Sequence, residues 1–277
     1  MKRLLFLLIF VCIVLKAQTH RFYYSLEYKL DSLQEIASKK TMVLDINPET
    51  VKYYDIVFLV KDSINKRTNS QNTNWTDQTP ITRNRNSYKN LNYRSIAFDI
   101  FSYPTEDKIK WNLEKEVKSY KELDIQKATT WFGGRHWTAW FTHSIPFNEG
   151  PYKFQGLPGL IVLLQDDQNT YNFTLLKSQN LKDTYDTSNI LEVRYGNRPF
   201  PVTEKVFTQK AIEYFNDPFH DAKVSLSSNP NSSVDYYGKR YKDGDDFTLA
   251  SKEEQKRILK KNNPIELNKA IRYKVIK

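Results

Sequence analysis

Residues 131–166 read WFGGRHWTAWFTHSIPFNEGPYKFQGLPGLIVLLQD, and this stretch decides how we expect the chain to fold. It holds three of the five tryptophans and five of the eight glycines. Residues 135–144 alternate with period two, with Trp137 and Phe141 on one face and Thr138 and Thr142 on the other. This pattern predicts a strand. The pair Gly133-Gly134 before it indicates a turn or bulge.

The second half of the stretch predicts a hairpin. Pro158 and Gly159 stand at the second and third positions of a four-residue turn, the type II pattern, in which glycine accepts a positive φ. Gly156, Pro158 and Gly159 are therefore interpreted as structural turn residues. The apolar run 160–164 predicts a strand covered on both faces, and residues 171–177 predict its antiparallel partner.

The hexapeptide GLPGLI at residues 156–161 resembles the signature of the bacterial GLPGLI protein family. Blocks at 42–46, 126–129, 134–135, 140–142, 145–146, 150–154 and 263–267 resemble the family's other blocks, so the resemblance covers nearly the whole chain after residue 17. It implies an exported, mostly β protein of unassigned activity. It gives no catalytic residues to carry over.

Residues 1–17 have the pattern of a signal peptide. Lys2 and Arg3 precede a twelve-residue apolar run that is too short to span a bilayer, and Ala17 stands before the expected cleavage point. The alternatives are an uncleaved anchor and a lipoprotein at Cys12; Val11, where a small residue is needed, disfavours the second. We expect an exported protein, periplasmic or on the cell surface, with no transmembrane span in its mature chain.

The charge and cysteine content limit the possible partners. The formal net charge is +10, but the basic residues are spread along the chain, whereas nucleic-acid-binding proteins cluster them. We therefore expect no nucleic acid partner, and attraction to an anionic lipid or lipopolysaccharide surface stays open. The only cysteine lies within residues 1–17, so the mature fold must depend on core packing. No cofactor is expected.

The rest of the chain predicts an α+β fold that is mainly β. Strands are expected at 21–30, 41–46, 51–60, 93–103, 109–113, 189–195 and 271–276, and helices at 203–215 and 251–261 with Thr203 and Ser251 as N-caps. The polar residues 62–92 are interpreted as a surface insertion. We expect residues 18–277 to form a single domain with one curved antiparallel sheet or half-barrel and one or two helices from the C-terminal third.

Few residues suggest a metal or catalytic site. His136 and His143 are seven residues apart and would face opposite sides of a strand, so they cannot share a metal ion there without a bulge. Asp166, Asp167 and Asn169 could bind Ca²⁺ but are also ordinary turn residues. No metal site is predicted.

The residues predicted to bind a ligand lie in the aromatic stretch: Arg135, Trp131, Trp137, Trp140 and Tyr152. Arg135 could bind a carboxylate, stack on Trp137 or form a cross-strand ion pair. The rings could form a large aromatic core or line a groove for an apolar or extended ligand.

These observations favour a binding module over an enzyme. The expected partner is an envelope protein, a peptide segment or an apolar ligand. The alternatives are an envelope hydrolase, whose acid and base groups would come from scattered Asp, Glu and His residues, and a surface assembly component. A pocket with convergent, desolvated carboxylates or histidines near Arg135 would favour the hydrolase.

Overall fold

The computed structural model of the chain describes residues 18–73, 75–194 and 196–274. The predicted signal peptide, residues 1–17, lies outside this described part. Among the described residues, no helix is long and apolar enough to cross a membrane.

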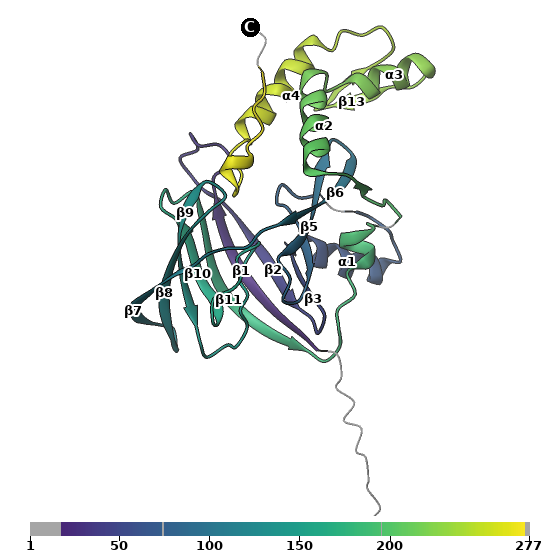
Figure 1. The fold of residues 1–277 in the computed structure, drawn as a ribbon. Helices are drawn as coiled ribbons and strands as arrows, with labels where there is room; N and C mark the ends of the chain where they lie inside the picture. The colour runs from purple at the N-terminus through teal and green to yellow at the C-terminus, as the bar shows by residue number, and fades with distance from the viewer. Residues whose placement is uncertain (1–17, 74, 195, 275–277) are drawn as a thin grey trace, which may run out of the picture.

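One large sheet organises the described chain (Figure 1). Its strands are β1 (Thr19–Tyr28), β2 (Ser38–Ile46), β3 (Thr50–Asp55), β4 (Ile81–Asn84), β5 (Lys89–Ile96), β6 (Asp99–Glu106), β7 (Asn112–Tyr120), β8 (Leu123–Phe132), β9 (Arg135–Thr142), β10 (Leu160–Asp166), β11 (Tyr171–Leu181) and β12 (Phe200–Pro201). Their order across the sheet is β12-β6-β5-β4-β3-β2-β1-β11-β10-β9-β8-β7.

The sheet is curled but open. Adjacent strands are antiparallel except β12, which runs parallel to β6. Within the described chain, β7 and β12 each pair on one side only, so the sheet does not close into a barrel. The predicted α+β class with a curved antiparallel sheet is confirmed at this level, although the sheet is larger than a half-barrel.

The 131–166 stretch forms the strand and the first half of the hairpin that its sequence pattern predicts. β8 and β9 are joined by the turn at Gly133-Gly134, and Trp137, Ala139 and Phe141 of β9 are fully buried on one face. This inner face carries the main core. β10 and β11 form the predicted hairpin.

The connection between β9 and β10, residues 143–159, is irregular and packs against the inner face; we call it the inner loop. Phe154 and Leu157 are buried in the main core. Glu149 forms an ion pair with Arg83 of β4, and Gln155 donates to the carbonyl of Ser87. The inner loop therefore joins distant parts of the curl from within.

The expectation of a surface insertion at residues 62–92 is wrong. The segment contains most of α1 (Val57–Thr68), all of β4 and the start of β5, and β4 lies between β3 and β5 in the sheet. Polar residues in it are buried because they have partners: Asn92 donates to Tyr103 O and Thr105, and Asp62 accepts from Tyr185 and Lys66. Side-chain hydrogen bonds replace the apolar burial that the sequence lacks.

α1 also corrects the predicted strand at 51–60, because β3 ends at Asp55. The Asp55 carboxylate accepts the Val57 N–H at the start of the helix. Phe58 of α1 packs with Tyr54 and Val43 on the outer face of the sheet, where the π-helix η1 (Ser188–Glu192) joins them. A strand was expected at 189–195, but residues 189–192 belong to this helix.

The C-terminal third forms a helical cap over one end of the sheet (Figure 1). It consists of α2 (Glu204–Asn216), α3 (His220–Ser228), the hairpin β13 (Val234–Tyr236) with β14 (Lys239–Tyr241), α4 (Thr248–Lys260) and the short 3-10 helix η2 (Leu267–Lys269). Thr203 caps α2 as predicted, accepting the Val206 N–H. α4 begins before Ser251, because Asp246 accepts the Thr248 N–H.

The cap therefore holds three α-helices where one or two were expected. After α4 the described chain contains no final strand at 271–274; residues 262–273 instead descend to the end of the sheet and turn back, with Asn262 hydrogen-bonded to Ile271. We call this segment the strap.

Candidate functional site

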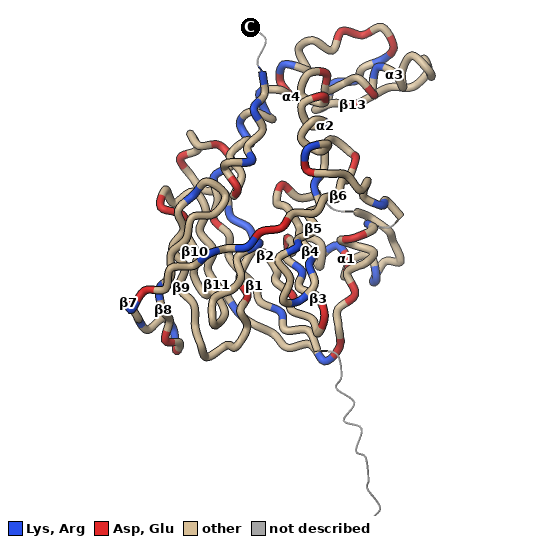
Figure 2. Tube along the Cα trace, viewed as in Figure 1, with Lys and Arg blue, Asp and Glu red and all other residues tan. Residues whose placement is uncertain are grey.

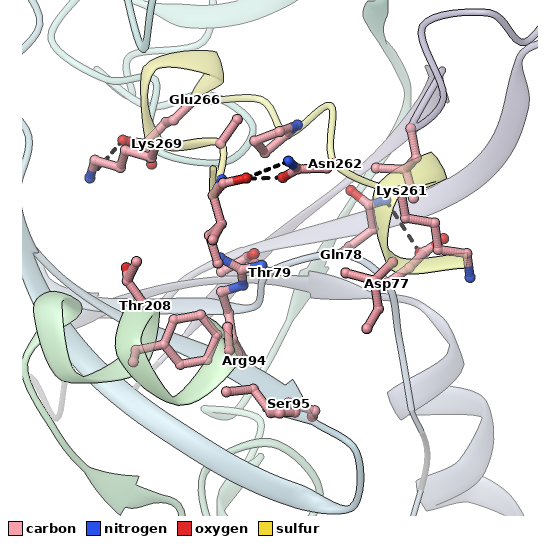
Figure 3. A pocket seen from close by; sticks show the side chains of 18 of the residues that line it. Asp77, Gln78, Thr79, Arg94, Ser95, Thr208, Lys261, Asn262, Glu266 and Lys269 are labelled. Atoms are coloured by element: carbon pink, nitrogen blue, oxygen red, sulfur yellow. Dashed lines mark hydrogen bonds and ion pairs between the residues drawn. The ribbon is translucent and has the colours of Figure 1, made fainter. Parts of the chain in front are cut away.

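A cavity of about 940 Å³ lies at the end of the sheet that the cap covers (Figure 3). Its walls come from the segment before β4, the β5–β6 hairpin, α2, α4 and the strap. Eight aromatic side chains contribute to the lining: Trp75, Phe98, Tyr103, Tyr152, Tyr171, Phe207, Tyr214 and Tyr273.

The strap that covers the cavity is fixed mainly by Arg135. The Arg135 guanidinium donates to the carbonyls of Ile265 (3.1 Å) and Pro264 (3.0 Å) and to the Asn263 side chain (2.6 Å). It also forms an ion pair with Asp166 at 2.9 Å. Arg135 is buried by these contacts, so the cross-strand ion pair is the alternative that the structure supports.

Close backbone packing explains the two glycines beside Arg135. A Cβ on Gly133 would lie 2.7 Å from the Cα of Glu266, and one on Gly134 would lie 3.0 Å from the Asn268 nitrogen. The Asn268 N–H donates to the Gly133 carbonyl at 3.1 Å. The strap therefore packs directly on the Gly-Gly turn, at a distance that leaves no room for a Cβ atom on either glycine.

A buried ionic cluster ties the strap to the inner loop and to the end of β6. The Glu266 carboxylate accepts from Lys153 at 2.6 Å and from Tyr152 at 2.7 Å, and it pairs with Lys269 at 2.8 Å. Lys153 also pairs with Asp107 at 3.0 Å. Burial would raise the pKa of Glu266, but the two lysines outweigh it and hold this pKa below its ordinary value.

A second ion pair lies at the opposite wall. Lys40 pairs with Asp77 at 2.7 Å and with Asp55 at 2.8 Å, and the Tyr28 hydroxyl donates to Asp77. Burial acts to raise the pKa of Asp77, but Lys40 outweighs it and the pKa lies below the ordinary range. The Asp77 carboxylate is therefore held ionised.

The β5–β6 hairpin supplies further side chains that line the cavity. Arg94 of β5 lies in the cavity beside Thr208 of α2 (Figure 3), and its guanidinium is 4.7 Å from the ring centre of Phe207. At the hairpin tip Ala97 has a φ of +48°, and Phe98 is 87% exposed. Phe98 meets Trp75 edge-to-face at 6.5 Å.

The five residues predicted to bind a ligand do not form one surface. Only Tyr152 lines the cavity. Trp137 is fully buried and donates its indole N–H to the Phe132 carbonyl. Trp131 is 75% exposed, and Trp140 is half-buried under Lys118, whose ammonium lies 3.6 Å from its ring centre. A binding role for this set stays a prediction, and the cavity is the better candidate site.

The predicted turn residues do not form the expected type II turn. Gly156 has a φ of +99°, but Gly159 has a φ of +159°, at the extended limit and far from the value of about +80° in a type II turn. A Cβ on Gly159 would lie 2.0 Å from the Thr142 carbonyl oxygen. Glycine is required there because β9 passes so close to it. Pro158 is exposed beside it.

The residues considered for a metal have other partners. Asp166 accepts the N–H groups of Thr170 and Tyr171, as expected of a turn residue, and His136 contacts Asp167 at 2.8 Å. His143 is exposed beyond the end of β9. Among the described residues, no three His, Cys, Asp or Glu side chains are placed to hold a metal ion together.

Sequence analysis missed Arg94, Trp75 and Phe98 as site residues. Residues 93–103 were interpreted as one strand, whereas they form parts of β5 and β6 with a tight turn between them. That turn has no glycine, proline or asparagine to mark it. The strap did leave a signal, since residues 263–267 are one of the blocks on which the family resemblance rests.

One family model matches the chain, over residues 59–163, and the family is described as a protein of unknown function (Porph_ging). The matched segment runs from α1 into β10 and contains the GLPGLI hexapeptide. The match is compatible with the resemblance that the sequence shows, although it carries another name. None of the curated proteins matches this sequence significantly.

Solved structures of PNGF-II share the fold. The structure in space group C2 aligns with a TM-score of 0.52 at 11% identity, and that in P21 with a TM-score of 0.51 at 12% identity. Each alignment covers 70% of this chain and 33% of the other, so the chain matches about a third of the PNGF-II length. At these identities the likeness concerns the fold alone.

Proposed function

We propose that this chain is a non-enzymatic binding module of the cell envelope and that its ligand occupies the cavity under the strap. The cavity carries the proposal, because its volume of about 940 Å³ falls among those of small-molecule sites, about 300–1,000 Å³. Many aromatic walls with a few placed polar groups are typical of such sites. The envelope location rests on the signal-peptide pattern of residues 1–17.

The charges around the cavity favour binding over hydrolysis. A general acid or base is most effective when its pKa lies near the working pH. The pKa values of Asp77 and Glu266 are instead lowered by paired lysines, so these carboxylates stay ionised and engaged. The four histidines of the sequence are absent from the cavity lining.

Filling the cavity tests this proposal. Thr208 is half-buried on α2 and lines the cavity, whereas its neighbour Gln209 is exposed and points elsewhere. Thr208→Trp should occupy the ligand space, and Gln209→Trp adds the same ring outside it. Both variants would be incubated with an organic extract of the cell envelope and analysed by native mass spectrometry.

We expect a small-molecule adduct on the wild type and on Gln209→Trp, and none on a folded Thr208→Trp. An adduct retained by Thr208→Trp places the ligand elsewhere, and the cavity would then lose its role. Absence of any adduct on the wild type would also count against the proposal.

A further inference from the structure

The ligand class can be inferred from the cavity, on the basis of the function proposed above. Three carboxylates line it, and each pairs with a lysine: Asp77 with Lys40, and Glu204 and Glu266 with Lys269. Six cations line it: Lys40, Arg94, Arg257, Lys261, Lys269 and Arg272. The lining therefore holds more cations than carboxylates, and although Arg257 is paired with Glu254 outside the lining, the remaining imbalance favours an anionic ligand.

Three of these cations, Arg94, Lys261 and Arg272, have no carboxylate partner among the ion pairs of the described residues. Lys261 and Arg272 are exposed, so water screens them. Arg94 is the exception, because it is half-buried between α2 and the sheet. Figure 2 shows that basic positions also recur along α4 and the strap.

Arg94 is held in position without being neutralised. Its guanidinium stacks near the ring of Phe207 at 4.7 Å, and the Tyr103 hydroxyl is its polar neighbour. Both rings belong to the packed junction of α2 and β6. A planar guanidinium fixed in this way presents several N–H donors that match the two oxygens of a carboxylate.

An apolar path leads from Arg94 to the outside. Side chains two residues apart on a strand share a face, so Ile96 follows Arg94 along the same side of β5. Phe98 and Trp75 stand beyond it at the mouth, 87% and 46% exposed. Large exposed rings at the rim of a cavity fit an apolar group that is only partly enclosed.

We propose that the cavity binds an amphiphile with one anionic head group, of the fatty-acid class. Its carboxylate is bound by Arg94, and its aliphatic chain runs past Ile96 and leaves over the paired rings of Trp75 and Phe98. The head group neutralises the half-buried one of the three cations that have no carboxylate partner, and the chain covers the apolar path.

Titration calorimetry with three twelve-carbon probes below their micelle concentrations tests this assignment. Dodecanoate, dodecanol and dodecyltrimethylammonium share one chain and differ in head-group charge. We expect dodecanoate to bind at least about tenfold more tightly than dodecanol, as for a hydrogen bond to a charged group, and the cation to bind most weakly. Equal affinities for the acid and the alcohol would overturn the assignment.

Arg94→Gln tests the residue itself, with Arg67→Gln on the exposed end of α1 as the matched control. We expect Arg94→Gln to lower dodecanoate affinity about tenfold or more and to leave dodecanol affinity unchanged, and Arg67→Gln to change neither. An equal loss for both probes would mean that Arg94 supports the cavity rather than the head group, and would overturn the assignment.

Phe98→Asp provides a second variant if Arg94→Gln does not fold, because its site is mostly exposed. The added negative charge should weaken dodecanoate more than dodecanol; an unchanged ratio of affinities contradicts the proposal. The proposal that the cavity holds a ligand and the proposal that this ligand is an anionic amphiphile can fail separately. Envelope adducts lost on Thr208→Trp together with no preference for dodecanoate would refute the ligand class alone.

Discussion

Aromatic side chains are dense in two regions of the molecule, residues 131–154 and the mouth of the cavity. In the first region Trp137, Phe141 and Phe154 are fully buried and pack around the inner loop. At the mouth, Trp75 and Phe98 come from separate segments, and they are 46% and 87% exposed. Aromatic density along the sequence therefore marks the core here, whereas the candidate ligand surface is assembled from separate segments.

The largest expected effect is on the first region. Trp137 has no exposed surface, and its ring centre lies 4.7 Å from that of Phe154. Trp137→Ala should lower the free energy of unfolding by about 3–5 kcal/mol, because it leaves a cavity and removes buried apolar area. Urea denaturation measures this change. A loss below about 1 kcal/mol would show that this ring is not a core residue.

Gly159→Ala should come next. The new methyl group would lie 2.0 Å from the Thr142 carbonyl oxygen, so β9 and the inner loop must separate. We expect a loss of about 3 kcal/mol, as for overpacking in a rigid site. Gly244→Ala is the control, because its φ is also positive (+81°) but nothing lies within 4 Å of its Cβ. Equal melting temperatures for the two variants would contradict the packing argument.

Acid should weaken the attachment of the strap. Burial raises the pKa values of Glu266 and Asp107, but Lys153 and Lys269 outweigh it and hold both below their ordinary values. A lowered pKa adds stability above the unfolded-state pKa, about 4, and this stability is lost as the pH falls through the folded-state pKa.

Thermal melts between pH 7 and pH 3 should therefore show a decline below about pH 4 that is smaller in the variant Glu266→Gln. The variant starts from lower stability at pH 7, because Lys153 loses a charged partner. Identical pH dependence in both proteins would show that Glu266 does not contribute to acid sensitivity.

The smallest effect on stability is expected at the mouth. Phe98→Ala removes a ring that is 87% exposed, so the free energy of unfolding should change by no more than about 0.5 kcal/mol. Dodecanoate binding should weaken at the same time. A large loss of stability would show that the mouth is packed like the 131–154 region and would remove the contrast between the two.

Local patterns predicted the elements whose residues alternate clearly. The faces of β9, the β10–β11 hairpin and the N-cap at Thr203 all follow from residue spacing. β4 could not be predicted in this way, because its burial depends on Arg83 meeting Glu149, a residue 66 positions away. The β5–β6 turn was also missed, since Ala97 takes a left-handed conformation that its sequence does not favour.

The candidate site could not be read from the sequence for a related reason. Its polar groups can be interpreted only after the ion pairs are known. Of the six lining cations, Lys40, Lys269 and Arg257 pair with carboxylates, and among the three that do not, Arg94 is the half-buried one. Arg135 seemed the more interesting charge because of its neighbours in sequence. In the fold its donors are taken by Asp166 and the strap.

The strap also sets the mechanics of the sheet. The bore of a closed barrel is determined by its strand number and stagger, whereas an open sheet has no such geometric constraint. Here the strap joins the turn at Gly133, on one arm of the curl, to Asp107 near the other, through Glu266 and Lys269. The two arms are therefore held together by side-chain and turn contacts of the strap instead of a closing strand ladder, and the width of the bore beneath it depends on those contacts.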